Sequence, residues 1–251
     1  MTLFGRRIPM MFSLLFWALI WEIVGHADMV FLIPPFSDVL IAGAELIQTA
    51  SFQASFAITL KAFTIGMVLA IIVGIPLGVL MGRVEAADRL LGLWVNVFVS
   101  APLTALVPVI MILFGIGQTT IIVTVVLFAV WIIALDTRAG VKHISLSLLD
   151  MGRSFCATRR QLYTKLLLWA ALPEMLAGIR VGLIRGVKGV VIGQLLVSII
   201  GLGELFEVYS RNFLMDKFWA VTILLFAFAV TLSELIEWLE RKIEYYAGTR
   251  N

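Results

Sequence analysis

Six long apolar runs alternate with shorter polar or charged segments along the chain. They cover residues 10–24, 56–81, 90–113, 119–135, 176–200 and 218–236. About 20 apolar residues in a helix cross the ~30 Å hydrocarbon core of a bilayer. The runs lack the apolar–polar alternation that the strands of a membrane β-barrel require. The pattern therefore predicts an all-α integral membrane bundle of six transmembrane helices, in a single domain over residues 1–251.

The first run follows Arg6 and Arg7 and is similar to the start of a signal peptide. No Ala-x-Ala-like cleavage site follows it, and Trp17, Trp21 and Glu22 are unusual in a cleaved segment. We interpret this run as a retained membrane anchor.

Composition supports the membrane assignment and excludes several kinds of functional site. Of the 251 residues, 61% are hydrophobic and 14% charged, against roughly 45–50% and about 25% in soluble domains. Cys156 is the single cysteine, and His26 and His143 are the two histidines, which excludes an internal disulfide and a Cys/His metal cluster. No G-x-x-x-x-G-K-[S/T] motif is present, so a P-loop for ATP is excluded. We expect no enzyme activity, no cofactor in this chain and no nucleic-acid partner.

Lysine and arginine positions predict the orientation of the bundle. Segments rich in these residues resist translocation and stay in the cytoplasm. With the N-terminus inside, the outer segments hold Arg211 and Lys217. The cytoplasmic segments then hold Arg6, Arg7, Arg83, Arg89, Arg138, Lys142, Arg153, Arg159, Arg160, Lys165, Arg241, Lys242 and Arg250. Both termini are therefore predicted to face the cytoplasm.

The inner segment at about 136–175 is the longest connection and the most basic part of the chain. Its apolar residues recur at helical spacing, at Leu146, Leu149, Phe155, Leu162 and Leu166. Two interpretations remain open. Short amphipathic helices here form a docking surface for a cytoplasmic partner, or they lie on anionic membrane lipid.

Two predicted spans carry small residues at four-residue spacing. The second has Gly66, Ala70, Gly74, Gly78 and Gly82, and the fifth has Gly178, Gly182 and Gly186, continued by Gly189 and Gly193. Such ladders let membrane helices approach closely. They serve either packing inside the bundle or a subunit interface or substrate path.

Charged residues inside the fifth span indicate a polar path. Lys188 lies about 18 Å into the span, and a charge at that depth normally faces the bundle interior or an aqueous cavity. We therefore place Arg185, Lys188 and Gln194 on a substrate path and expect an anionic solute. Acidic residues inside the runs are limited to Glu22 and Glu234, both near run ends, which disfavours a proton-coupled secondary transporter.

The inner segment reads DMGRSFCATRRQL over residues 150–162 and LWAALP over 168–173. It resembles the EAA loop of bacterial ABC importer permeases, closest to the branch that serves nitrate, taurine and aliphatic sulfonates. Four further segments resemble that branch in the same order along the chain: IPPFSDVL at 33–40, GIPLG at 74–78, FGIG at 114–117 and IIGLG at 199–203.

The departures from the family pattern lie within the loop itself. Asp150 replaces Glu, Met151 and Gly152 replace two Ala, Cys156 replaces Gly, Leu166 replaces Ile and Trp169 replaces Pro. The family glycine permits a turn between two short helices, because glycine reaches positive φ without steric cost. Cys156 reaches that conformation only with strain or by another turn. The loop is therefore either helical through Cys156 or docks on a divergent ATPase.

The resemblance implies a type I ABC importer (MetI-like) permease, a multi-pass protein of the bacterial inner membrane. It implies a cytoplasmic ABC ATPase dimer that hydrolyses ATP with Mg²⁺, a periplasmic or lipid-anchored substrate-binding protein and a second permease subunit, with a homodimer favoured over a heterodimer. The ATPase-coupling residues would be Asp150, Gly152, Arg153, Ser154, Cys156, Ala157, Arg159, Arg160 and Leu162. The departures leave one alternative, a non-transporting scaffold or regulatory membrane subunit.

Overall fold

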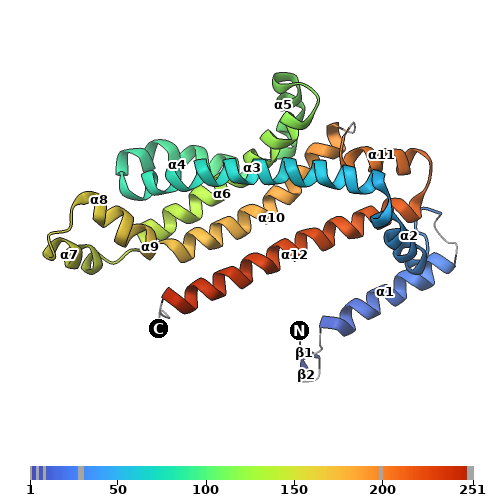
Figure 1. Ribbon diagram of the computed structural model, residues 1–251, viewed down its shortest axis with the longest axis horizontal. Helices are drawn as coiled ribbons and strands as arrows, with labels where there is room; N and C mark the ends of the chain where they lie inside the picture. Colours follow the sequence, from blue (N-terminus) through green and yellow to red (C-terminus); the bar gives the residue numbers. More distant parts are fainter. Residues whose placement is uncertain (1, 4–5, 8–9, 28–30, 198–199, 248–251) are drawn as a thin grey trace.

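The computed structural model describes all residues except 1, 4–5, 8–9, 28–30, 198–199 and 248–251 (Figure 1). Ile199 and Arg250, used above, lie outside the described residues. Strands β1 (Thr2–Leu3) and β2 (Arg6–Arg7) form a short antiparallel pair. The helices are α1 Met10–His26, α2 Phe36–Gln48, α3 Ala50–Arg83, α4 Glu85–Ser100, η1 Leu103–Leu106, α5 Val107–Phe114, α6 Gln118–Lys142, α7 Leu146–Ser154, α8 Arg159–Gln161, η2 Leu162–Leu167, α9 Leu168–Ala170, α10 Leu172–Val197, α11 Leu202–Arg211 and α12 Met215–Ala247.

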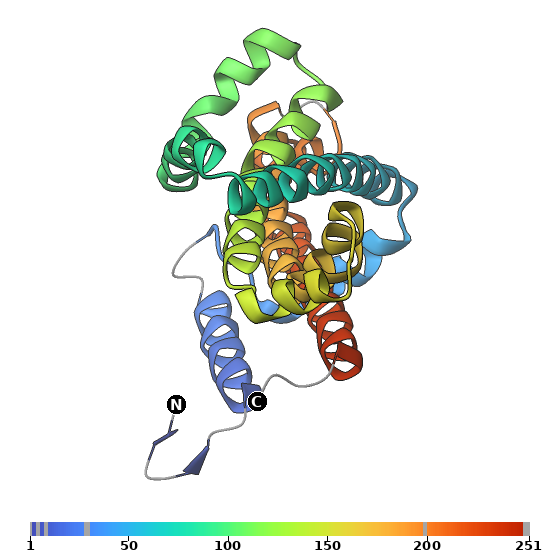
Figure 2. The ribbon, with the colours of Figure 1, turned by 90° about the vertical axis from the view of Figure 1, so that its left-hand side faces the viewer.

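The long helices α3, α6, α10 and α12 run lengthwise through the molecule (Figure 1). Helix α6 packs against both α3 and α10 and forms the centre of the bundle. Helices α7, α8 and α9 lie at one end, and α2 and α11 lie at the opposite end (Figure 1). Seen from the α7–α9 end, α1 stands apart from α3, α6 and α10 (Figure 2).

Most glycines of the two small-residue ladders face α6, and Gly186 lies closest to Met67 on α3. A Cβ atom on Gly78 would lie 2.5 Å from the carbonyl oxygen of Ala134, and one on Gly182 would lie 2.7 Å from Cγ1 of Ile133. Gly66, Gly74 and Gly82 on α3 and Gly178 and Gly189 on α10 meet α6 in the same way. Without side chains at these positions, the helix backbones come close enough to gain contact area. The ladders therefore serve packing inside the bundle, the first of the two interpretations.

The predicted spans fall on helices within the described residues. By length and composition, α3, α6 and Met215–Leu235 of α12 can each cross a membrane. Two bent pairs, Glu85–Ser100 with Leu103–Phe114 and Arg159–Ala170 with Leu172–Val197, qualify when each pair is taken as one span. Helix α1, with 17 residues, is a shorter apolar helix.

The run 90–113 is not one continuous helix as predicted. It forms two helical segments that meet at 97°. Pro102 disfavours a helical conformation in the residue before it, and Ala101 is extended, at φ −68° and ψ 148°. Pro108 lies in the first turn of α5, where its missing N–H leaves no helical hydrogen bond unmade. The prolines thus divide the third span into two halves.

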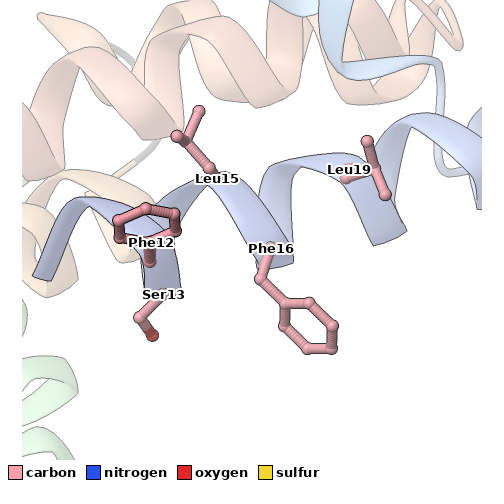
Figure 3. A pocket seen from close by; sticks show the side chains of 5 residues that line it. All are labelled: Phe12, Ser13, Leu15, Phe16 and Leu19. Carbon is pink, nitrogen blue, oxygen red and sulfur yellow. The ribbon is translucent and has the colours of Figure 1, made fainter. Parts of the chain in front are cut away.

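Among the described residues, the hydrogen bonds that attach helix α1 to the bundle lie near its C-terminal end. The Glu22 carboxylate accepts hydrogen bonds from the Ser37 N–H (2.9 Å) and hydroxyl (2.8 Å) in the first turn of α2. The Trp21 indole donates to the Pro34 carbonyl at 3.0 Å. Farther along the helix toward its start, the side chains of Phe12, Leu15, Phe16 and Leu19 are all exposed, beside the exposed Ser13 (Figure 3). Exposed side chains that are mostly apolar fit a lipid environment.

Candidate functional site

Helix α7 ends at a tight turn centred on Cys156. The Cys156 N–H donates to the Arg153 carbonyl at 2.8 Å, and the Ala157 N–H donates to the Gly152 carbonyl at 3.1 Å. This pair of bonds is a Schellman motif, which places the residue after the helix in the left-handed region. Cys156 has φ 55°, although a non-glycine residue pays about 1–2 kcal/mol for that conformation. The interpretation that the helix continues through Cys156 is therefore wrong.

A second short helical stretch begins directly after this turn. Thr158 and Gln161 form a capping box: the Gln161 N–H donates to the Thr158 hydroxyl at 3.3 Å, and the Thr158 N–H donates to Gln161 Oε1 at 2.9 Å. The box satisfies backbone donors that would otherwise be unpaired at the start of a helix. The inner segment thus consists of two helical arms joined at Cys156. Its ends differ from the predicted 136–175, because α6 continues to Lys142 and α10 begins at Leu172.

Two of the predicted coupling residues pack inside the loop. A Cβ atom on Gly152 would lie 2.5 Å from Leu166 Cδ1 and 2.6 Å from Leu162 Cδ2, so a larger residue here would require both leucine side chains to shift. Gly152 is buried and Leu162 half-buried. Further inward, a separate apolar cluster joins the loop to α6 and α10: Val141, Ile144, Leu149, Leu167, Ala171 and Met175.

The other predicted coupling residues lie on the surface of the loop. Asp150, Arg153, Ser154, Cys156, Arg159 and Arg160 are exposed, and Ala157 is half-exposed. Arg153 pairs with Asp150 at 3.0 Å, and the Ser154 hydroxyl donates to the Asp150 carbonyl at 3.0 Å.

Beside these polar residues, the side chain of Phe155 is 81% exposed and that of Met151 48%. We define the docking face as Met151, Arg153, Phe155, Arg159 and Arg160. Exposed aromatic residues and arginines are both enriched in protein interfaces. Sequence reasoning treated Phe155 only as part of a helical repeat and so missed its exposure.

A cation–π contact connects the loop to α3, and ion pairs connect α4 to the end of α6, where the loop begins. Asp88 on α4 pairs with Arg138 and Lys142 at the end of α6. The Arg83 guanidinium at the end of α3 lies 5.3 Å from the ring centre of Tyr163, within range of a cation–π interaction. The loop thus contacts α3 directly, and α4 is held to the end of α6 from which the loop leaves.

The structure does not bring Arg185, Lys188 and Gln194 together, although all three lie on α10. Arg185 donates to the Val99 carbonyl at 3.4 Å, next to the break after α4. Gln194 is 1% exposed and bonds to Thr59 on α3. Lys188 is exposed and lines a groove between α10, α11 and α12 with a volume of about 570 Å³.

Arg185 is well placed to hold the break in the third span. The last carbonyls of a helix have no partner within it and carry the negative end of the helix dipole, which a cation stabilises. One residue earlier, the Phe98 ring stacks on Trp131 of α6, with ring centres 4.4 Å apart and planes 5° apart. Both α6 and α10 thus fix the end of α4.

Comparison with known proteins identifies the family. Residues 74–245 match the model of the binding-protein-dependent transport system inner membrane component. The chain is 30% identical over 203 residues to the taurine transport system permease protein TauC of Escherichia coli, covering 79% of this chain and 72% of TauC. It is 25% identical over 227 residues to the putative aliphatic sulfonates transport permease protein SsuC of Bacillus subtilis, covering 89% of this chain and 82% of SsuC.

Among solved structures, the chain is similar to an inward-facing conformation of the MetNI methionine ABC transporter, with a TM-score of 0.60 and 26% identity over 79% of this chain and 95% of that chain. The helical bundle, the loop between α6 and α10 and the match over residues 74–245 agree with one another. The chain therefore belongs to the family of inner membrane components of binding-protein-dependent transport systems, and it is a permease subunit of an ABC importer.

Proposed function

We propose that this permease passes a small anionic solute across the bacterial inner membrane, with both of its termini in the cytoplasm. The solute is delivered by an external substrate-binding protein, and a cytoplasmic ABC ATPase dimer hydrolyses ATP with Mg²⁺. The docking face carries the contact with the ATPase. The left-handed turn at Cys156 supports this proposal most directly, because it keeps the two-armed shape of the loop where the family has glycine.

Coupling follows from the way the loop is attached. The docking face is exposed, whereas the inner side of the loop is packed on α6 and α10 through an apolar cluster. Packed cores switch between discrete arrangements rather than deform gradually. A force applied at Phe155 would therefore move α6 and α10 as rigid bodies. Asp88 passes the same displacement to α4 through its two ion pairs.

An anionic solute agrees with the charges on α10. Arg185 and Lys188 are both cations within the length of this helix, and the named relatives transport taurine or aliphatic sulfonates, which carry a sulfonate group. We propose that Arg185 and Lys188 border the path. Gln194 is buried among protein partners and would act on the path through its contact with Thr59.

A second permease subunit completes the path, and we propose a second copy of this chain. The exposed side of α10 carries Val181, Ile184 and Leu195, with exposed fractions of 38%, 41% and 45%. These positions and Lys188 are three, four and seven residues apart along α10, which places them on one face of the helix. Two copies facing each other across this surface would enclose a path between them.

The lone cysteine provides a direct test. A membrane-impermeant maleimide is added to inside-out and right-side-out vesicles, with and without the cognate ABC ATPase. We expect Cys156 to react only in inside-out vesicles and to be protected at least tenfold by the ATPase. Reaction in right-side-out vesicles would overturn the orientation. Labelling that the ATPase leaves unchanged would overturn the docking proposal and favour a non-transporting scaffold.

A further inference from the structure

Helix α11 ends in a second tight turn, at the end of the bundle opposite the docking face (Figure 1). The Phe213 N–H donates to the Ser210 carbonyl at 3.2 Å, and the Leu214 N–H donates to the Tyr209 carbonyl at 2.9 Å. This pair of bonds is again a Schellman motif, in which the residue after the helix is usually glycine. Here that residue is Phe213, at φ 55°, a conformation that bulky residues rarely adopt. Among the described residues, Cys156 and Phe213 are the two non-glycine residues with positive φ.

The strained turn leaves the Phe213 side chain uncovered. Phe213 is 62% exposed and lies beside Phe31, which is 76% exposed. The two ring centres are 6.1 Å apart and the ring planes are tilted by 52°, within the range of a favourable aromatic pair. We define the outer aromatic pair as Phe31 and Phe213. Backbone strain persists only where surrounding contacts hold it, and it clusters at functional positions.

Contacts on both sides fix the position of the outer aromatic pair. The Leu32 carbonyl, next to Phe31, accepts a hydrogen bond from the Trp219 indole of α12 at 2.8 Å. On the other side, α11 is packed into the bundle through Leu205 and Phe206, which are buried. A surface that is already ordered loses little conformational entropy when a partner binds. The pair is therefore pre-organised for a contact.

The surroundings of the pair favour a water-soluble partner over lipid. Glu204 and Arg211 are exposed on α11, and Glu207 pairs with Arg211. Charged side chains on this surface meet water, because ions are costly in hydrocarbon. Phe213 precedes the apolar span of α12, which begins at Met215. The aromatic residues enriched at a membrane–water interface are tryptophan and tyrosine, which carry a polar group that phenylalanine lacks.

We propose that the outer aromatic pair is a docking surface for the external substrate-binding protein. The family that the chain matches belongs to binding-protein-dependent transport systems. In the proposed orientation, such a protein reaches the bundle from the end that holds α2 and α11 (Figure 1). Aromatic residues are enriched at the centre of protein interfaces, and the partner would offer an apolar contact patch for the two rings. The inference rests on the proposed function and assigns residues to one of its partners.

Photo-cross-linking of the full chain in phosphatidylcholine nanodiscs tests the contact. Benzoylphenylalanine replaces Phe31, Phe213 or Phe226 in turn, and the discs are irradiated with the cognate substrate-binding protein. Phe226 is the matched control, because it is 63% exposed but lies within the span of α12. We expect adducts with the binding protein at positions 31 and 213 and none at position 226. Adducts at positions 31 and 213 with lipid alone, or with a second copy of the chain, would overturn the proposal.

Affinity measurements separate the contribution of the Phe213 ring from that of the turn. F213A and F213G should each weaken binding of the substrate-binding protein at least tenfold, whereas F213Y should stay within about threefold of the wild type. F213G also relieves the positive φ, so its thermal stability should stay close to that of the wild type. F226A should bind like the wild type. Unchanged affinity in F213A and F213G would overturn the proposal.

The labelling of Cys156 tests the orientation and the ATPase contact separately. Protection of Cys156 by the ATPase without cross-linking at position 213 would overturn this inference alone. Reaction of Cys156 in right-side-out vesicles would overturn the orientation on which both proposals depend.

Discussion

Gln194 on α10 donates a 2.8 Å hydrogen bond to the hydroxyl of Thr59 on α3, and the two side chains are 1% exposed. The same hydroxyl accepts the N–H of Leu202 at 3.2 Å and donates to the Ser55 carbonyl at 2.8 Å. A Cβ atom on Gly201, which has φ 69°, would lie 2.3 Å from Gln194 Nε2. The pair thus connects two long helices to the turn that leads into α11.

Replacing Thr59 by Val should destabilise the protein by about 2 kcal/mol. The substitution keeps the shape but leaves the Leu202 N–H and the Gln194 amide without an acceptor, and a buried unpaired donor costs about 1–3 kcal/mol. Thermal unfolding in detergent would measure the loss. Thr64→Val is the control, because Thr64 is exposed on the same helix. Equal stability of the two variants would mean that this cluster contributes nothing.

Cys156→Gly should stabilise the loop by about 0.5–1 kcal/mol. Glycine removes the steric cost of φ 55° but adds entropy to the unfolded chain, so the net gain is smaller than the strain itself. Cys156→Val should destabilise it, because a β-branched side chain is poorly accommodated at positive φ. Hydrogen exchange at the N–H groups of Cys156 and Ala157 would report the change. Faster exchange in the glycine variant would contradict the argument.

The sequence predicts the spans and the ladders well because both depend on local periodicity. Gly74, Gly78 and Gly182 needed only a helical spacing to be placed on one face, and that face packs on α6. The break in the third span is different. Pro76 lies inside a run as Pro102 does, yet α3 continues through Pro76 and the chain bends by 97° near Pro102. Residues of α6 and α10, which are distant in the sequence, hold the bend near Pro102. No local sequence pattern reveals such contacts.

The loop between α6 and α10 is likewise only partly predictable from the sequence. Its two-armed form was visible in the family motif, but the conformation of Cys156 depends on which of two turns the surrounding contacts stabilise. Gly152 and Leu162 share a motif with Arg153 and Arg159, although the first two pack inward and the other two are exposed. Short irregular helices, including the π-helix η2, give no regular period from which an inward and an outward side could be assigned.

Gly78→Ala should destabilise the bundle by about 1–3 kcal/mol, the usual cost of overpacking a well-filled core. The new methyl group would lie 2.5 Å from the Ala134 carbonyl oxygen and 2.6 Å from Thr137 Cβ, so α3 and α6 must separate. Gly43→Ala is the matched control, because its Cβ would meet only Ala220 Cβ at 3.8 Å. Thermal unfolding of both variants measures this difference in stability. A Gly78 variant as stable as the Gly43 variant would show that the contact between α3 and α6 tolerates expansion.

Phe155→Ala should weaken binding of the ABC ATPase at least tenfold while leaving the stability of the permease nearly unchanged. The ring is 81% exposed, so its removal creates no cavity, whereas a central aromatic anchor of an interface commonly contributes 2 kcal/mol or more to binding. Affinity is measured by titrating the ATPase onto the permease in nanodiscs, with thermal unfolding alongside. Phe31→Ala serves as the control, because Phe31 is 76% exposed but lies before α2, at the other end of the bundle. If the two variants bind the ATPase equally well, Phe155 is not the anchor, and the arginines of the docking face must hold the partner by charge alone.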